Sequence, residues 1–212
     1  MWNTSSRRTD LPLRIGITGG IGSGKTLVCS VFRSLGVDIF EADSVAKELY
    51  DGNDNVRLQL KELFGQGIYT PEGKFIRKHL AAIIFSDREA LQKVNAIIHP
   101  LVKAAFEQWI EQKTGVYVLH EAAILFESGF YKLMDANILV TATYELRIQR
   151  VIDRDHVLRE DVIIRMQNQF PEEESLKMAD FIIKNDGSDF VIKQVLDIDK
   201  RIKERQLGEQ TK

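Results

Sequence analysis

A glycine-rich stretch near the start of the chain has residue types suited to holding phosphate. Residues 19–26 read GGIGSGKT and match the pattern G-x-x-x-x-G-K-[ST]. Its glycines let the backbone bend so that successive N–H groups face one anion, and a helix beginning near Gly24 adds its positive dipole end. Lys25 is expected to reach the β- and γ-phosphates, and the Thr26 hydroxyl to bind Mg²⁺. The nucleotide site is therefore predicted to consist of Gly20, Ile21, Gly22, Ser23, Gly24, Lys25 and Thr26. The alternative, a turn that fits the pattern by chance, is disfavoured by the strand before it and the helix after it.

The loop predicts nucleotide binding but does not identify the group that receives phosphate. A GTPase would need a guanine-specific motif such as N-K-x-D, which the sequence lacks. In the stretch IFEADSVAK, Asp43 closely follows an apolar strand, at the sheet edge where ligands gather. We predict that Asp43 faces the γ-phosphate from the acceptor side and is the general base of a small-molecule kinase. The alternative is that Asp43 caps the next helix. Lys47, one turn on, holds Asp43 ionised or contacts the acceptor, and both hypotheses stay open.

Arginines recur in TYELRIQRVIDRD at a spacing that places Arg147, Arg150 and Arg154 on one helical face. Together they resemble the lid of nucleoside monophosphate kinases, in which arginines fold over ATP and neutralise charge on the transferring phosphoryl group. We predict this catalytic role for Arg150 and Arg154. The alternative is a solvated charged face paired with nearby acids, namely Asp153, Asp155 and Glu160.

Four other side chains are candidate ligands of metal or acceptor. Glu121 ends a predicted strand and is predicted to hold a magnesium-bound water, the alternative being a capping acid. Arg77, Lys78 and His99 are predicted to bind the phosphates of the acceptor. The alternatives are a histidine bonded to the backbone and basic side chains that are simply solvated.

The elements that must position these residues alternate between strand and helix. Short apolar runs predict strands at 13–18, 36–40, 116–121, 136–142 and 180–184, and helical spacing predicts helices at 24–35, 44–50, 77–85, 87–99, 100–112, 143–154, 171–179 and 189–206. The alternation favours an α/β fold with a parallel, doubly wound, five-stranded sheet. His99-Pro100 is interpreted as a junction between two helices, because the residue before proline disfavours helix.

Apolar stripes predict which helix faces are buried. The helix at 24–35 is expected to bury Leu27, Val28, Val31, Phe32 and Leu35. The last helix is expected to bury Phe190, Val191, Val195, Leu196 and Ile202. Cys29, the one cysteine, is expected to be a buried packing residue and fits a reducing compartment.

Composition limits the class of protein. The 212 residues are 44% hydrophobic, enough for one sizeable core, and a net charge of −2 gives no basic field for nucleic acid. Residues 1–10 are polar and are predicted to be a disordered leader, and no apolar run is long enough to span a bilayer. We expect a cytoplasmic protein without a nucleic-acid or membrane partner; the sequence predicts no oligomeric state.

From about residue 13 to 206, the chain resembles the dephospho-CoA kinases. The resemblance depends on an ordered set of segments: ITGGIGSGKT, LGVDIFEAD, IFSD, NAIIHPLV, ILFESGFY, QRVIDRD and ADFIIKNDG. Asp43 matches the base of the family. The chain has Glu41 where the family usually has aspartate, and Ala123 and Ile124 where it usually has proline before L-L-F-E.

The resemblance implies ATP-dependent, magnesium-dependent phosphorylation of the ribose 3′-hydroxyl of dephospho-CoA, the last step of coenzyme A synthesis. It implies a P-loop NTPase three-layer fold with a helical CoA-binding insertion at 44–115 and a short lid at 147–170. The core would then comprise residues 11–43, 116–146 and 171–206. The alternatives are another small-molecule P-loop kinase, acting on a sugar acid or nucleotide, and a nucleotide-binding regulator. Lys25, Thr26 and Asp43 argue against the regulator.

Overall fold

The structure is a computed structural model that describes residues 11–210, apart from the side chains at 85, 86, 88 and 207–210. The predicted leader at 1–10 lies outside the described residues. Contacts between residues divide the chain into two compact units. One comprises the chain up to Phe40 and from Ile110 onward, and the other is Glu41–Trp109. Among the described residues, no helix is both long enough and apolar enough to cross a bilayer.

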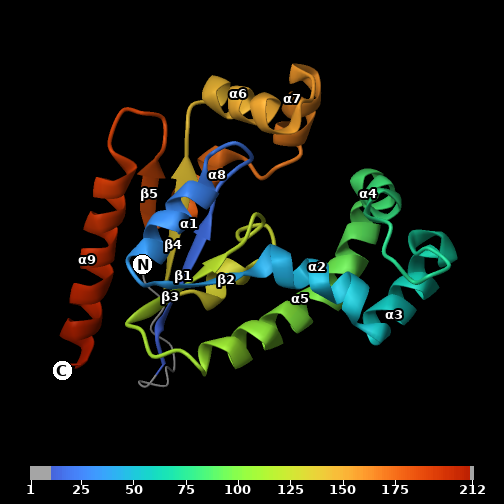
Figure 1. The fold of residues 1–212 in the computed structure, drawn as a ribbon, viewed down its shortest axis with the longest axis horizontal. Helices are drawn as coiled ribbons and strands as arrows, with labels where there is room; N and C mark the ends of the chain where they lie inside the picture. The colour runs from blue at the N-terminus through green and yellow to red at the C-terminus, as the bar shows by residue number, and fades with distance from the viewer. Residues whose placement is uncertain (1–10, 211–212) are drawn as a thin grey trace. The chain divides into compact units, whose positions relative to one another are not determined.

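The predicted five-stranded α/β sheet is confirmed (Figure 1). Its strands are β1 Leu13–Thr18, β2 Asp38–Glu41, β3 Tyr117–Glu121, β4 Ala136–Thr141 and β5 Phe181–Lys184, in the order β2-β3-β1-β4-β5. β1 pairs in parallel with both β3 and β4, and β4 pairs in parallel with β5. The central position of β1 places the loop that follows it between the ends of β3 and β4. This is the edge at which parallel α/β sheets bind ligands.

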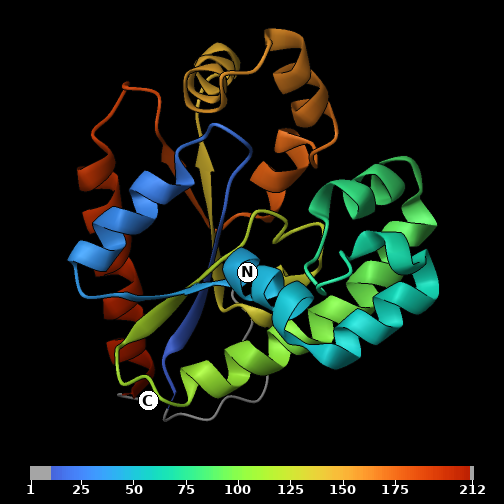
Figure 2. The same cartoon turned by 45° about the vertical axis from the view of Figure 1, so that its right-hand side comes forward.

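Helices pack on the sheet in the first unit. It contains α1 Lys25–Ser34, α6 Tyr144–Asp155, α7 Arg159–Gln167, α8 Glu172–Met178 and α9 Val191–Gln210, with the short η2 Phe130–Leu133. α1 and α9 lie side by side, and in Figure 2 α8 lies on the opposite side of β4. Alternate residues of the strands meet α1 and α9 in one core, which includes Ile15, Ile138, Phe32 and Val195. This packing fixes α1, and with it the end of the loop, relative to the sheet.

The second unit is helical. It contains α2 Ala42–Gly52, α3 Asp54–Phe64, η1 Gln66–Ile68, α4 Arg77–Ser86 and nearly all of α5 Arg88–Ile110. Between α3 and α4, Tyr69 and Phe75 form an isolated antiparallel bridge. Tyr50 stacks on Phe75 with ring centroids 4.5 Å apart, which ties the connection back to α2.

The predicted junction at His99-Pro100 is wrong, because α5 runs through Pro100 without interruption. Val94, Ile98, Val102 and Phe106 are all at most 5% exposed and lie four residues apart, so one buried stripe crosses the proline in register. A proline inside a helix costs one hydrogen bond and some strain, but burial of this stripe on both sides favours a continuous helix.

Two predicted apolar stripes are partly wrong. Val28 and Phe32 of α1 are fully buried and Cys29 is nearly so, whereas Leu27 is 52% exposed. In α9, Val195 and Ile202 are buried, but Phe190 is 82% exposed. Each helix contacts the sheet along a narrower face than its apolar residues cover, so Leu35 and Leu196 also stay exposed. Helix α7 lies in the segment before residue 170, for which we predicted no element.

Candidate nucleotide-binding and catalytic site

The predicted phosphate-binding loop connects the carboxyl end of β1 to the first turn of α1. Gly22 and Gly24 have φ of 79° and 86°, the left-handed region that glycine adopts without strain. A Cβ on Gly24 would collide with the side-chain amide of Asn185, and one on Gly22 with the backbone of Arg147. The glycines are therefore required by backbone conformation and by close packing, as their spacing predicts.

Backbone donors of the loop fall into two groups. Within residues 11–210, the N–H groups of Gly22 and Gly24 have no hydrogen-bond partner. By contrast, the Ile21 N–H donates to Oε1 of Gln169 at 2.8 Å, and the Ser23 N–H donates to the Gly20 carbonyl at 3.0 Å. The prediction that successive N–H groups all face one anion is therefore too simple. The N–H groups of Gly22 and Gly24 are available to donate a hydrogen bond to an anion, whereas the Ile21 N–H is bonded to Gln169.

The loop lysine is paired with the acid that ends β3. Nζ of Lys25 forms an ion pair and hydrogen bond with a carboxylate oxygen of Glu121, and both side chains are largely buried. Their meeting follows from the topology, because β1 and β3 are neighbours and Ile17 lies opposite Glu121. The structure thus brings together two residues that we predicted for phosphate and for metal.

Few side chains near the loop are suited to binding Mg²⁺, and Mg²⁺ in such sites needs only one or two protein ligands. The described residues contain no group of three or more histidine, cysteine, aspartate or glutamate side chains that could cage a metal. Mg²⁺ in phosphotransferases is instead held by one or two protein oxygens, water and the phosphates of the substrate. Thr26, exposed in the first turn of α1, and Glu121 at the neighbouring strand end fit that donor set.

The three arginines of α6 have different surroundings. Arg147 is buried and Arg150 lies at the loop, where its Nη1 donates to the carbonyls of Gly22 at 3.3 Å and Ser23 at 3.4 Å. Arg154 is exposed and binds Asp155 through Nε at 2.7 Å, which is the ion pair of the alternative hypothesis. The structure therefore brings Arg150, but not Arg154, to the loop, and the role of Arg154 over ATP stays a prediction.

Asn185, which sequence analysis missed, holds the other side of the loop. It follows β5 directly and is 6% exposed, and its Nδ2 donates to the Ser23 carbonyl at 2.9 Å. Nη2 of Arg150 reaches its Oδ1 at 3.5 Å. The signal was available, because Asn185 comes just after a strand at the same edge of the sheet.

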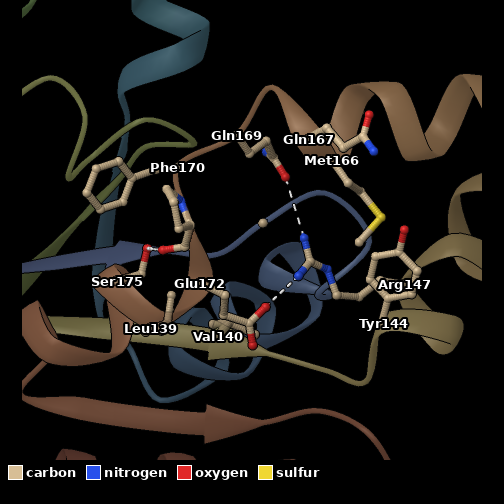
Figure 3. Close-up of a pocket in the computed structure, with 12 residues that line it drawn as sticks. Leu139, Val140, Tyr144, Arg147, Met166, Gln167, Gln169, Phe170, Glu172 and Ser175 are labelled. Carbon is tan, nitrogen blue, oxygen red and sulfur yellow. Dashed lines mark hydrogen bonds and ion pairs between the residues drawn. The ribbon is translucent and has the colours of Figure 1, made fainter.

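A cavity of about 330 Å³ lies beside the loop (Figure 3). Its lining is largely apolar and aromatic, with Tyr144, Met166 and Phe170 among its residues, and Gly20 contributes the loop backbone. Figure 3 shows the guanidinium of Arg147 between Gln169 and Glu172, with dashed lines to both. Gln169 and Glu172 were also missed by sequence analysis.

The remaining predicted residues belong to the second unit. Asp43 is half-buried in the first turn of α2, and Lys47 is exposed one turn later. Arg77 and Lys78 are exposed at the start of α4, where the charge of Arg77 acts on Tyr50. His99 is half-buried within α5, and burial lowers its pKa. The N-cap position of α2 is Glu41, so the structure does not place Asp43 at the cap.

Comparison with known proteins identifies the family. A family model described as dephospho-CoA kinase matches residues 13–190. The chain belongs to the dephospho-CoA kinase family. Members of this family carry out the last step of coenzyme A biosynthesis, in which phosphate is transferred to a hydroxyl.

Named relatives agree. The dephospho-CoA kinase of Chlorobium chlorochromatii is 40% identical over 185 residues, which cover 84% of this chain and 87% of that one. The Bacteroides fragilis protein of the same name is 36% identical over 189 residues, covering 89% and 92%. Among solved structures, a Thermus thermophilus protein superposes with a TM-score of 0.81 at 34% identity, covering 90% of this chain and 97% of that one. The dephospho-CoA kinase of Campylobacter jejuni gives 0.64 at 28% identity, with the same coverage.

Proposed function

We propose that this chain transfers the γ-phosphate of ATP, bound with Mg²⁺, to the ribose 3′-hydroxyl of dephospho-CoA, which yields coenzyme A and ADP. One observation supports nucleotide binding above all others. The loop at the centre of the sheet presents the unpartnered N–H groups of Gly22 and Gly24 and the ammonium of Lys25 together, at the start of α1. This combination of oriented backbone donors, helix dipole and one cation is suited to a polyphosphate.

Lys25 and Arg150 would stabilise charge on the transferring group. Lys25 is held by a carboxylate in this structure, and its ammonium has only to turn from Glu121 to reach a phosphate oxygen at the loop. Arg150 makes bonds of 3.3 to 3.5 Å to the loop and Asn185, which are long for a guanidinium and leave it able to exchange partners. Mg²⁺, held by Thr26, Glu121 through water and the phosphates, would neutralise charge on the β- and γ-phosphates.

Asp43 would prepare the acceptor. The 3′-hydroxyl oxygen attacks the γ-phosphorus as the bond from phosphorus to the bridging oxygen of ADP breaks, and the carboxylate of Asp43 accepts the hydroxyl proton. Lys47, Arg77, Lys78 and His99 are proposed to contact the acceptor, because a substrate carrying a diphosphate favours basic partners. The cytoplasmic location, like these contacts, stays a prediction.

A coupled assay of ADP release tests the proposal. The purified chain is supplied with ATP and Mg²⁺, and with dephospho-CoA, gluconate, shikimate or a nucleoside monophosphate as the acceptor. We expect release that depends on dephospho-CoA, and coenzyme A as the second product. Faster turnover of gluconate or shikimate would indicate a different small-molecule kinase. Release without any acceptor would indicate an ATPase and contradict the proposal.

A further inference from the structure

Arg147 differs from the other arginines of α6, because its side chain is buried against the phosphate-binding loop. The residue is 7% exposed. Its Nε donates to the carbonyl of Ile21 at 3.0 Å, and its Nη1 donates to a carboxylate oxygen of Glu172 at 2.5 Å (Figure 3). Both bonds are charge-assisted and belong to the stronger class of protein hydrogen bonds. The Arg147 side chain is 9% exposed, whereas that of Glu172 is 38% exposed.

The N–H, the carbonyl and the side chain of Ile21 each contact another part of the protein. Its N–H donates to Gln169 at 2.8 Å, and its carbonyl accepts from Arg147. Its side chain packs against Ile148, Val151 and Val162, which are fully buried between α6 and α7. The second residue of the GIGSG turn is therefore attached to α6, α7 and the segment after α7, and its backbone polar groups do not face a bound phosphate.

Glu172 holds the guanidinium of Arg147 at its Nη1. One carboxylate oxygen binds Nη1 of Arg147, and the other accepts the hydroxyl of Thr141, the last residue of β4. Oε1 of Gln169 lies 3.5 Å from Nη2, which occupies the remaining edge of the fork. A chain of contacts thus runs from the end of β4 through Glu172 and Arg147 to the loop.

The glycines of the loop fit closely against the same side chain. A Cβ on Gly20 would collide with the guanidinium of Arg147, and one on Gly22 with its backbone. At Gly22 the neighbouring atoms belong to the backbone of α6, so one added carbon could not be accommodated without moving the loop or the helix. The positions of the Gly20 and Gly22 backbones are therefore set in part by their packing against Arg147.

We propose that Arg147 and Glu172 are positioning residues of the phosphate-binding loop. The pair clamps the Ile21 peptide, so that the N–H groups of Gly22 and Gly24 point toward the phosphates before the nucleotide arrives. Removing the pair releases Ile21, and binding must then order the loop as well as hold the ligand. The proposal rests on the proposed function only in that the anion is a nucleotide phosphate.

Three variants and two measurements test the pair. Arg147→Gln, Arg147→Lys and Glu172→Gln are compared with wild type by calorimetric titration with ADP and Mg²⁺. In the ligand-free proteins, amide hydrogen exchange at Ile21 and Gly22 is followed by NMR. We expect ADP to bind about tenfold more weakly to Arg147→Gln, as the loss of a charged hydrogen bond implies. The Ile21 amide should exchange faster. Glu172→Gln should change both quantities in the same direction, and Arg147→Lys should not restore them, because an ammonium lacks the planar fork.

Whereas Glu172 and Arg147 join α8 to α6, Arg159 and Glu145 provide a control pair that joins α7 to α6. They form an ion pair of 2.7 Å, with side chains 45% and 69% exposed, and neither bonds to the loop. Arg159→Gln removes an arginine–carboxylate pair of the same kind from α6 and α7. We expect its ADP affinity and its Ile21 exchange rate to equal those of wild type.

A purely structural role would give a different pattern. Arg147→Gln would then melt earlier but, at a temperature where it is folded, bind ADP with wild-type affinity and protect the Ile21 amide as well as wild type does. That result would overturn the proposal. If Arg147→Gln does not fold, Glu172→Gln, which keeps the arginine, decides between the two outcomes by the same measurements. A wild-type chain that binds ADP but does not phosphorylate dephospho-CoA would contradict the proposed function and leave this test intact.

Discussion

Nζ of Lys25, in the first turn of α1, is ion-paired with a carboxylate oxygen of Glu121, the last residue of β3. The two side chains are 13% and 18% exposed, so the pair is shielded from solvent. A cation and an acid that we assigned from the sequence to the nucleotide and its metal are therefore already in contact. Each is expected to change partner when ATP and Mg²⁺ bind, and substitution of each has a distinct consequence.

Lys25→Ala should abolish turnover while the fold persists. Lys25 contacts Glu121 and, in the proposed function, phosphate, and it is not one of the apolar residues of the core. Loss of its charge from the transition state should cost at least about 10² in kcat. The melting temperature should fall, because Glu121 loses its partner in a largely buried position, but the chain should stay folded at the assay temperature. Lys93→Ala, which removes an exposed lysine paired with Glu89 in α5, is the control and should keep full activity. Wild-type turnover by Lys25→Ala would refute the loop assignment.

Glu121→Gln should change the dependence of the rate on magnesium. The amide keeps the shape of the carboxylate but loses the charge that would hold a magnesium-bound water. A partner of this kind is typically worth 10–100-fold in metal affinity or activity, so the Mg²⁺ concentration for half-maximal rate should rise by about that factor. Calorimetric titration with ADP in the absence of Mg²⁺ should show binding at least as tight as that of wild type. The reason is that Lys25 no longer has to break its ion pair with Glu121 to reach a phosphate. An unchanged magnesium dependence would leave Glu121 with only its role as the partner of Lys25.

Asp43→Asn tests the general base. The N-cap position of α2 is Glu41, and Asp43 lies in the first turn, where a carboxylate stabilises a helix by about 0.3–1 kcal/mol. Stability should therefore change little. A lost general base predicts a fall of roughly 10²–10⁴ in kcat with ADP binding intact. Glu48→Gln, which neutralises an exposed acid on the same helix, is the matched control. An Asp43→Asn enzyme within a few-fold of wild-type kcat, with chemistry rate-limiting, would remove Asp43 from the mechanism.

The strands and the loop could be predicted because their signals are local. Short apolar runs such as LRIGIT have little alternative to a buried strand, and GGIGSGKT carries its own backbone requirement at Gly22 and Gly24. The continuous helix through Pro100 could not be predicted in this way. The proline rule is local, whereas the stripe that overrides it is visible only once Val94 and Phe106 are known to be buried together.

The residues that support the phosphate-binding loop, Arg147 and Glu172, are far apart in the sequence and meet only in the folded chain. Glu172 is one of three consecutive acids in PEEES, and nothing in the sequence distinguishes it from Glu173 or Glu174. Only the fold brings it to Arg147, 25 residues earlier. Helical spacing also grouped Arg147 with Arg154, although α6 buries one and exposes the other. Spacing predicts which residues share a face, but the neighbouring loop and helix decide what each of them binds.

Arg154 and Arg165 form a matched pair for testing the lid. Both bind the carboxylate of Asp155, Arg154 at 2.7 Å and Arg165 at 3.0 Å, and both are substantially exposed. Because exposed ion pairs contribute at most about 1 kcal/mol, either change to glutamine should leave the melting temperature nearly unchanged. Of these two arginines, Arg154 alone is predicted to fold over ATP. Arg154→Gln should therefore lower kcat by roughly tenfold or more, and Arg165→Gln should not. Equal rates for the two variants would assign Arg154 to the solvated face instead.

The pH dependence of stability should be set in part by His120, the residue before Glu121. Its ring is stacked between those of Phe40 and Phe130, with centroids 5.3 Å and 5.2 Å away, and burial lowers its pKa from 6.5 to about 4. Below pH 6.5 the unfolded chain takes up a proton at this histidine and the folded chain does not, so the free energy of unfolding falls as the pH falls from 6.5 to 4.

The lowered pKa of His120 corresponds to a loss of about 3 kcal/mol in the free energy of unfolding between pH 6.5 and 4. His120→Phe keeps an aromatic ring in the stack and removes the titrating group, so its stability should fall less over the same range. Urea unfolding of both proteins at pH 7.5, 5.5 and 4.5 measures the difference, in which contributions from His99 and the carboxylates cancel. The gap in stability between the two proteins should shift in favour of His120→Phe as the pH falls. A gap that is the same at all three pH values would show that His120 is protonated equally in the folded and unfolded chains.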